Sequence, residues 1–322
     1  MIINKIKELI SDDIKKVDII INNSLNSNIK YINDINKHII YNKGKRLRPI
    51  ILLLIAKACK YTGSNHISSA AIIELIHTAT LLHDDVIDES LIRRGQITVN
   101  NKWNNKSAIL IGDFLYSRAF QMMVKIKNIN ILKILSNSTN TLSEGEILQL
   151  LQQKNFTINE NNYLKIIHYK TATLFQAAAN IGSLLNDNSK HLSKNISKYG
   201  FHLGIIYQLI DDILDYLSQK NMYGKHDGND LKDGKITLPL IYILKNGKKE
   251  EKNLIIKNIN IKDEKTLQEI KKIIINSNAL DYTMSMAKKH ANEAKKAISS
   301  LTKSKYLDSL IYIIDFIINR KN

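Results

Sequence analysis

Hydrophobic positions recur at helical spacing along almost the whole chain of 322 residues. Apolar side chains return every three or four positions, which places them on one face of an α-helix. Gly63, Gly95, Gly182 and Gly247 separate several of these segments, as is typical of glycines just beyond helix ends. The pattern predicts helices over residues 2–25, 28–42, 47–61, 66–90, 106–125, 128–153, 160–186, 189–218, 236–245, 250–258, 264–277, 280–300 and 304–319.

The chain shows no alternating strand pattern of useful length, no proline- or serine-rich linker and no internal repeat. Two prolines and twelve glycines are too few for the frequent turns of an all-β protein. A hydrophobic content of 44% is enough for a sizeable core. We therefore predict an all-α fold, a single large helical bundle formed by one domain of residues 1–322.

The expected location follows from the N-terminal segment, the apolar runs and the cysteine content. The N-terminal residues carry charges throughout and form no apolar stretch of the signal-peptide kind. The longest uninterrupted apolar run, residues 50–56, is far shorter than the roughly 20 residues of a membrane-spanning helix. The single cysteine, Cys59, excludes a disulfide scaffold and a zinc–thiolate cluster. These features predict a soluble cytoplasmic protein.

Two segments, 67–88 and 199–217, are apolar nearly all round, which predicts helices in the middle of the bundle. Each carries three aspartates with one spacing near its C-terminal end. They are Asp84, Asp85 and Asp88 in the first cluster, and Asp211, Asp212 and Asp215 in the second. Positions i and i+4 share a helix face, so the first and third aspartates of each cluster lie close together.

Carboxylates this close repel each other, and the helix macrodipole opposes negative charge at a helix C-terminus. Burial among apolar helices adds to the cost of each charge. Hard divalent cations take oxygen ligands of this kind, and Mg²⁺ binds through one or two carboxylates plus substrate phosphates. One such cluster could be a solvated acidic helix end, but two identical clusters on two apolar helices predict a cation site.

The charge balance is basic, with 47 Lys and Arg against 30 Asp and Glu, a formal net charge of +17. Such a surplus is typical of proteins that bind nucleic acid or anionic membranes. Here the lysines are scattered among many Asn and Ile residues, a composition typical of AT-rich coding sequences. Arginine is more informative, because four of only six lie in two short clusters, whereas Arg118 and Arg320 stand alone. The clustered guanidinium groups suit bidentate binding of phosphate oxygens.

Several polar groups accompany the aspartate clusters. Residues 44–49, with the sequence GKRLRP, begin a predicted helix, and a helix N-terminus with Lys and Arg forms an anion site. His77 lies two turns before Asp84 and Gln208 one turn before Asp211, on the corresponding faces. Taken alone, a histidine in an apolar helix is more often a satisfied core residue. The same caution applies to Lys170, Thr171 and Gln208.

Seven segments across residues 44–240 together resemble the trans-isoprenyl diphosphate synthases, and most of all the bacterial members that form octaprenyl products. In order they are GKRLRP, ELIHTATLLHDDVIDESLIRRG, GDFLYSRAF, EGEILQL, YKTATLF, YQLIDDILDY and GKHDGNDLKDGKITLPL. The resemblance implies a helical bundle of the isoprenoid synthase type, with a central cavity between the helices that carry the two aspartate motifs. It also implies a homodimer.

The resemblance implies a role for each matching residue. The diphosphate of isopentenyl diphosphate would be held by Lys45, Arg48, His77 and Arg94. Mg²⁺ bridging to the allylic diphosphate would be bound by Asp84, Asp88 and Asp211, supported by Asp85, Asp212 and Asp215. The allylic diphosphate would contact Arg93, Lys170, Lys225 and Lys235. The developing allylic cation would face the oxygens of Thr171 and Gln208, which with Lys170 are the candidate catalytic residues.

The implied reaction is the sequential condensation of isopentenyl diphosphate onto an allylic diphosphate such as farnesyl diphosphate. The departing diphosphate is neutralised by metal ions and basic side chains. The double bond of isopentenyl diphosphate then attacks the allylic cation, and proton loss to the released diphosphate leaves a trans double bond. Apolar helices keep water away from the cation. The product would supply a quinone side chain, with transient membrane contact during its release.

Product length is expected to depend on the residues below the first aspartate cluster. Thr80 and Ala79, four and five residues before Asp84, are small where short-chain members of the family have bulky aromatic residues. This difference predicts a long-chain product. Met123 and its neighbour Met122 are candidates for the floor of the product tunnel, although plain core packing would explain them equally well.

Alternative functions stay open at this point. A shorter-chain farnesyl or geranylgeranyl synthase would share every motif except the small residues at 79 and 80. A terpene synthase usually has an Asn/Ser/Glu motif in place of the second aspartate cluster. A nucleic-acid-binding helical protein would account for the charge of +17 but leaves the aspartates unexplained. Non-catalytic subunits of heteromeric synthases commonly lose motif residues, and none is missing here. We therefore expect diphosphate substrates and no nucleic acid.

Overall fold

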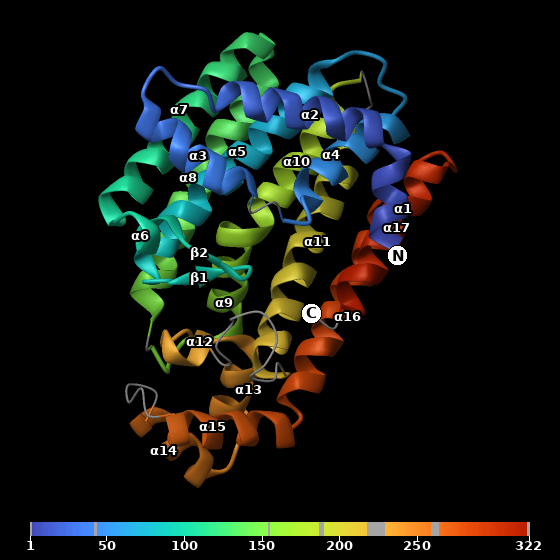
Figure 1. Cartoon of the computed structure of the whole chain (residues 1–322). Coiled ribbons are helices and arrows are strands. Elements are labelled where there is room, and N and C mark those ends of the chain that lie inside the picture. Colours follow the sequence, from blue (N-terminus) through green and yellow to red (C-terminus); the bar gives the residue numbers. More distant parts are fainter. Residues whose placement is uncertain are drawn as a thin grey trace.

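The structure, a computed structural model, describes residues 2–41, 44–153, 155–186, 190–217, 229–258 and 264–320. It confirms the predicted all-α architecture (Figure 1). Within the described residues, β-structure is limited to a hairpin of two short antiparallel strands, β1 (Ile92–Arg93) and β2 (Gln96–Ile97). None of the helices in this part of the chain has the length and apolar character needed to cross a membrane.

The first half of the chain contributes the helices α1 (Ile2–Leu9), α2 (Ser11–Ser24), α3 (Lys30–Tyr41), α4 (Leu47–Ala58), α5 (Asn65–Ile87), α6 (Val99–Lys102), α7 (Asn105–Ile126) and α8 (Ile129–Gln152). The second half contributes α9 (Glu160–Ile167), the π-helical turn η1 (His168–Ala172), α10 (Thr173–Leu184), α11 (Lys190–Leu217), α12 (Asn229–Lys232), α13 (Leu238–Asn246), α14 (Lys249–Asn258), α15 (Glu264–Asn276), α16 (Ala279–Ala297) and α17 (Lys305–Ile318).

Helices α4, α5, α10 and α11 form the centre of the bundle. Helix α10 packs against α4 and α11, and α5 packs against α4 and α7 (Figure 1). Residues 50–55 of α4 are almost completely buried, as expected of a helix that is apolar on every side. A hydrophobic cluster extends from Ile6 to Ile317 and includes residues of nearly every helix. The long apolar helices α5 and α11 are therefore held firmly in the core, with their aspartate-bearing ends at its edge.

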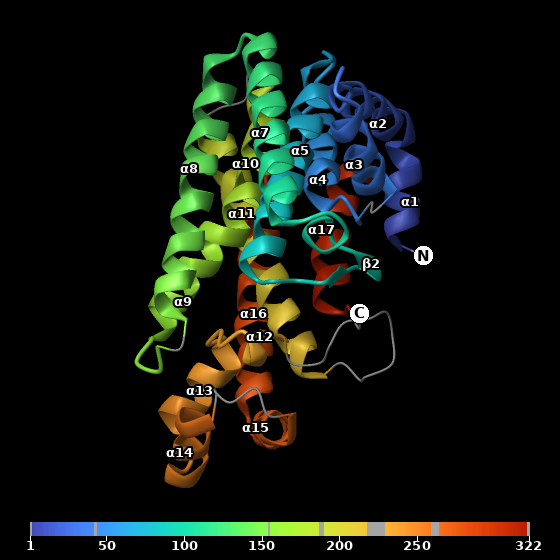
Figure 2. The same ribbon diagram turned by 60° about the vertical axis from the view of Figure 1, so that its left-hand side comes forward.

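The outer helices extend this core in two directions. Helices α7 and α8 run along one side of the bundle, and α13, α14 and α15 lie at its lower end (Figure 2). Helix α16 packs along α11, and α17 packs against α4, α11 and α1. The C-terminal end of the described chain consequently lies beside α11, far from it in sequence but close in space (Figure 1).

The observed elements differ from the predicted ones at several points. The predicted helix over residues 2–25 divides at Ile10 into α1 and α2. The predicted helix over residues 160–186 is interrupted by η1, where the backbone follows the wider π-helical path. The short helices α6 and α12 and the hairpin were not predicted. Each is too short to show a repeating hydrophobic pattern.

Two glycines make room for η1 between its neighbouring helices. A Cβ atom on Gly145 of α8 would lie 2.8 Å from the backbone nitrogen of Lys170, and one on Gly204 of α11 would overlap Ala172. Both helices therefore approach η1 more closely than any side chain permits. Single π-helical turns are frequent at functional sites, and this one carries Lys170 and Thr171.

We expect Gly204→Ala to destabilise the protein by about 1–3 kcal/mol, because the added methyl group pushes α11 away from η1. Urea unfolding followed by circular dichroism measures this change. Gly63→Ala is the control, since its Cβ would meet only the movable side chain of Tyr61. A Gly204→Ala protein as stable as the control would show that the close packing on η1 is dispensable.

Candidate functional site

The two aspartate clusters lie at the C-terminal ends of α5 and α11, as predicted. The segment 230–235 connects them. At one end, the backbone N–H of Asp230 donates to Asp215 Oδ2 over 3.2 Å. At the other, Lys235 Nζ lies 3.1 Å from Asp88 Oδ2. The clusters therefore face the same region of the molecule, from two helices far apart in sequence.

Cations from several elements offset the repulsion within the first cluster. Arg93 Nε of β1 donates to Asp85 Oδ1 over 2.6 Å. Lys170 Nζ of η1 lies 4.0 Å from Asp84 Oδ2, and Lys235 contacts Asp88. Burial opposes the charge on Lys235, but the negative groups around it raise its pKa above the usual value. Each aspartate of this cluster thus has a basic side chain beside it.

Burial differs among the aspartates more than their identical spacing suggests. Asp85 and Asp212 are 5% and 1% exposed, whereas the side chain of Asp211 is 39% exposed. Burial raises the pKa of Asp85 against the opposing effect of Arg93. Burial also raises the pKa of Asp212 well above its usual range, while hydrogen bonds from Tyr163 and Gln208 favour its ionised form.

Glu146 of α8 lies beside the first cluster, although it was not among the predicted site residues. Lys170 Nζ donates to Glu146 Oε2 over 2.7 Å. Burial, together with the nearby charge of Asp84, raises the pKa of Glu146 to about 7. This glutamate belongs to the segment EGEILQL, one of the seven segments that resemble the trans-isoprenyl diphosphate synthases. Its partnership with Lys170 depends on the packing of α8 against η1.

The donor atoms of the clusters suit a hard divalent cation. Among the described residues, Asp84 Oδ1 is buried and has no hydrogen-bond donor. No group of three or more His, Cys, Asp or Glu side chains in this part of the chain is arranged to hold a metal ion by itself. The buried oxygen of Asp84 matches a cation that takes one or two carboxylate oxygens from the protein and the rest from substrate phosphate and water.

Basic residues gather at the N-terminus of α4, next to the clusters. Arg48 Nη1 donates to His77 Nε2 over 3.1 Å and stacks on the ring of Phe175. Burial and the charge of Arg48 lower the pKa of His77 well below its usual value. His77 is therefore neutral, and because Nε2 accepts a hydrogen bond, its proton is on Nδ1.

The other predicted basic residues divide into two groups. The guanidinium of Arg94 lies against Gly44, and Lys45 Nζ lies over the ring of Phe316. These two residues thus join Arg48 and His77 around the start of α4. Arg46, in the same sequence cluster, instead pairs with Asp18 of α2. Lys225 lies outside the described residues.

Arg320 was not predicted to belong to the site, because its sequence neighbourhood carries no motif. The structure places its guanidinium 4.7 Å from the ring centroid of Tyr207, and it also pairs with Asp211. The side chain is only 6% exposed. In the sequence, the one indication of a role was that Arg320 is an arginine in a chain that mostly uses lysine.

The two remaining candidate groups lie deeper in the bundle. Thr171 Oγ1 donates to Gln208 Oε1 over 2.8 Å. The two residues predicted to face the allylic cation are therefore in direct contact. Ala79 and Met123 are fully buried on α5 and α7, which pack along each other. The Thr80 hydroxyl donates to the backbone carbonyl of His77.

The chain matches the family model described as polyprenyl synthetase over residues 29–276. It is 38% identical to the octaprenyl diphosphate synthase of Haemophilus influenzae, over 99% of this chain and 98% of that protein. It is 39% identical to the octaprenyl diphosphate synthase of Escherichia coli, over 99% of both chains.

Solved structures agree with these sequence relatives. A polyprenyl synthase from Caulobacter crescentus, complexed with calcium and isoprenyl diphosphate, superimposes with a TM-score of 0.95 at 33% identity, covering 99% of this chain and 98% of that one. A decaprenyl diphosphate synthase from Rhodobacter capsulatus superimposes with a TM-score of 0.94 at 33% identity, covering 99% of both chains. The chain therefore belongs to the polyprenyl synthetase family and is a prenyltransferase, matched over its full length by long-chain synthases.

Proposed function

We propose that this enzyme condenses isopentenyl diphosphate repeatedly onto an allylic diphosphate such as farnesyl diphosphate, and that its product is octaprenyl diphosphate. The observation that carries the proposal is the pair of aspartate clusters facing one region, with basic side chains beside them. The octaprenyl synthases among its relatives support the product length. We further propose a single domain over residues 1–322, a cytoplasmic location and a product used for a quinone side chain.

We propose Mg²⁺ as the cation, bound by Asp84, Asp88 and Asp211 and supported by Asp85, Asp212 and Asp215. The unpartnered Oδ1 of Asp84 supports this assignment, as does the calcium ion in the Caulobacter crescentus relative. When bound, Mg²⁺ would neutralise negative charge on the departing diphosphate.

The chain's own side chains perform the remaining tasks. Arg93, Lys170 and Lys235 already lie beside the first cluster, where they can exchange a carboxylate partner for an oxygen of the allylic diphosphate. We assign Lys225 to the same diphosphate by its motif alone. The residues around the start of α4 hold the second diphosphate, with neutral His77 donating from Nδ1. They are Lys45, Arg48, His77 and Arg94.

The reacting carbon lies, in this proposal, next to Thr171 and Gln208. Their oxygens can stabilise positive charge, and the apolar helices around them exclude the water that would capture it. The double bond of isopentenyl diphosphate is the nucleophile, and the proton lost after condensation passes to the released diphosphate, so the reaction requires neither a nucleophilic side chain nor a side-chain base. Because a long polyprenyl chain is almost wholly hydrocarbon, we also propose transient contact with a membrane during product release.

Incubation with radiolabelled isopentenyl diphosphate, farnesyl diphosphate and Mg²⁺ should give long-chain products, and EDTA should abolish them. Asp84→Asn should lower turnover by about 10²–10³-fold, because it removes a carboxylate from the proposed Mg²⁺ site that neutralises the leaving diphosphate. Asp113→Asn, on an exposed aspartate of α7, is the matched control. Ionisation of farnesyl diphosphate without consumption of isopentenyl diphosphate would indicate a terpene synthase instead.

Ala79→Tyr should shorten the product, because a tyrosine ring at this fully buried position would block a chain growing past α5. Reversed-phase chromatography of the dephosphorylated products measures the length. Ala79→Ser, which keeps the side chain small, should leave the length unchanged. Equal product lengths for the tyrosine variant and the wild type would place the tunnel elsewhere.

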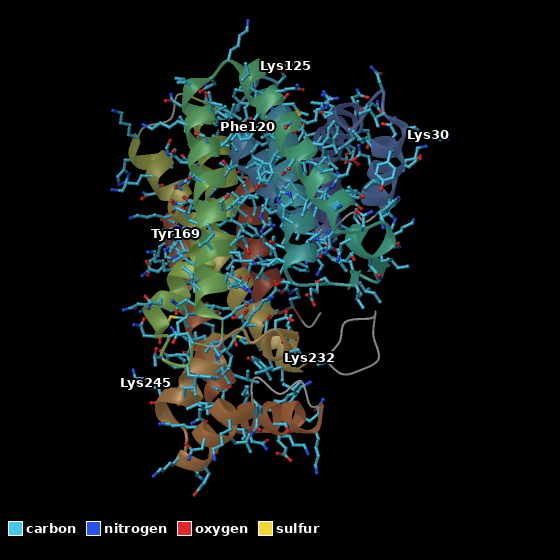
Figure 3. All side chains as sticks on the ribbon, turned by 90° about the vertical axis from the view of Figure 1, so that its left-hand side faces the viewer. Lys30, Phe120, Lys125, Tyr169, Lys232 and Lys245 are labelled. Carbon is cyan, nitrogen blue, oxygen red and sulfur yellow. The ribbon has the colours of Figure 1, made fainter. Side chains whose placement is uncertain are left out.

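We propose a homodimer formed through α7 and α8. Several large apolar side chains on these helices are exposed, and the two helices run along one side of the bundle (Figures 2 and 3). The exposed side chains are Ile109, Leu110, Phe120 and Val124 on α7, and Ile147, Leu150 and Leu151 on α8. A second copy of the chain would cover these exposed apolar side chains.

Replacing Leu110 and Val124 together by lysine should convert the dimer to a monomer, since both are about two-thirds exposed and would place charges in the interface. Sedimentation velocity gives the mass. Ile19→Lys, on an exposed residue of α2, should leave the dimer intact. A wild-type protein that sediments as a monomer would contradict the proposed assembly.

A further inference from the structure

Four hydrogen-bonded side chains connect α9, η1 and α11 beside the predicted site. Thr171 Oγ1 donates to Gln208 Oε1, and Gln208 Nε2 donates to Asp212 Oδ1, each over 2.8 Å. The hydroxyl of Tyr163 donates to the other oxygen of Asp212. Thr171 is adjacent in the chain to Lys170, whose Nζ lies 4.0 Å from Asp84. The row of hydrogen bonds thus ends next to the first aspartate cluster.

The direction of every bond in this row follows from Asp212. The amide nitrogen of Gln208 donates to Asp212 Oδ1, so the amide oxygen of Gln208 faces Thr171. Because that oxygen only accepts, the Thr171 hydroxyl has to donate to it. The lone pairs of Thr171 Oγ1 then stay available, and no N–H of Gln208 is directed at Thr171.

Tyr163 holds the acceptor in place. It is 4% exposed and Asp212 is 1% exposed, so water has little access to either group. Two donors, one to each carboxylate oxygen, prevent the carboxylate from turning. Gly204, one turn before Gln208 on α11, allows the close approach to η1 that brings Gln208 within reach of Thr171.

Asp212 also differs from Asp84 in the groups around its oxygens. Both oxygens of Asp212 accept hydrogen bonds from the protein. Among the described residues, Asp84 Oδ1 has no donor, and the basic group nearest to Oδ2 is the ammonium of Lys170, 4.0 Å away. A carboxylate whose two oxygens already accept hydrogen bonds from neutral donors is poorly placed to bind a cation directly, so the support that Asp212 gives the cation site is indirect. Asp84, by contrast, has an oxygen available to a cation.

We propose that Asp212 is a positioning residue that acts through Gln208, with Tyr163 as its second anchor. It ensures that the oxygens of Gln208 and Thr171, and not an amide N–H, face the carbon on which positive charge develops. This inference rests on the proposed function. Fixed dipoles of the correct sign lower the energy of the developing charge, and a reversed amide would raise it.

Asp212→Asn tests the assignment, because an asparagine can present an N–H to Gln208 and reverse its amide. We expect kcat for elongation to fall by roughly 10²-fold with unchanged KM values. Calorimetry with Mg²⁺ and inorganic pyrophosphate should give the wild-type affinity for this variant and a weaker one for Asp84→Asn. A purely structural role would not separate kcat from KM and binding in this way.

A double-mutant cycle identifies the route of the effect. Gln208→Met removes the amide dipole at nearly constant volume, and adding Asp212→Asn to it should lower kcat little further. Tyr163→Phe serves as a second variant if Asp212→Asn does not fold. Its effect on kcat should have the same sign, be smaller, and also vanish on the Gln208→Met background.

Two results would overturn the inference. One is that Asp212→Asn binds pyrophosphate as weakly as Asp84→Asn does. The other is that the substitutions of Gln208 and Asp212 lower kcat independently, so that the loss in the double variant is the product of the two single losses. Failure of the wild-type protein to elongate would refute the proposed function instead. The comparison of pyrophosphate affinities would then still decide whether Asp212 differs from Asp84.

Discussion

The repulsion among carboxylates at the ends of two apolar helices is the constraint on which this site depends. Helices α5 and α11 are held in the core by their apolar surfaces, so their acidic ends cannot move apart. Cations from distant parts of the chain offset this repulsion: Arg93 from the hairpin, Lys170 from η1, Lys235 from the segment after α12 and Arg320 from the C-terminal end. The fold is arranged so that each of these segments ends beside a carboxylate.

This arrangement prepares the protein for a diphosphate. Basic groups that balance the aspartates are already partly desolvated and held beside the site, so they lose little entropy when a phosphate replaces a carboxylate as their partner. Burial and the charge of Asp84 raise the pKa of Glu146 to about 7, whereas the ion pair with Lys170 favours its ionised form. His77 stays neutral among arginines, so it contributes a hydrogen bond without adding to their repulsion.

Close packing of the backbone positions the side chains around Thr171 and Gln208. Gly145 and Gly204 let α8 and α11 close on η1, and the wider turn of η1 presents Lys170 and Thr171. The same packing brings Thr171 to Gln208 and, through it, to Asp212 and Tyr163. A surface rich in apolar side chains surrounds these groups, so the polar contacts are few, buried and directional.

The sequence by itself determined the helical architecture, the buried character of α5 and α11, and the presence of two aspartate clusters near basic residues. These features follow from local rules, because helical periodicity and the i, i+4 spacing relate residues within a few turns. Only the tertiary structure decided which side chains meet. Arg320 reaches Asp211 across 109 residues, and Tyr163 reaches Asp212 across 49. The π-helical turn likewise arises from close packing against two glycines, which no periodic pattern records. Such contacts depend on how whole helices pack, and the distance along the chain carries no information about them.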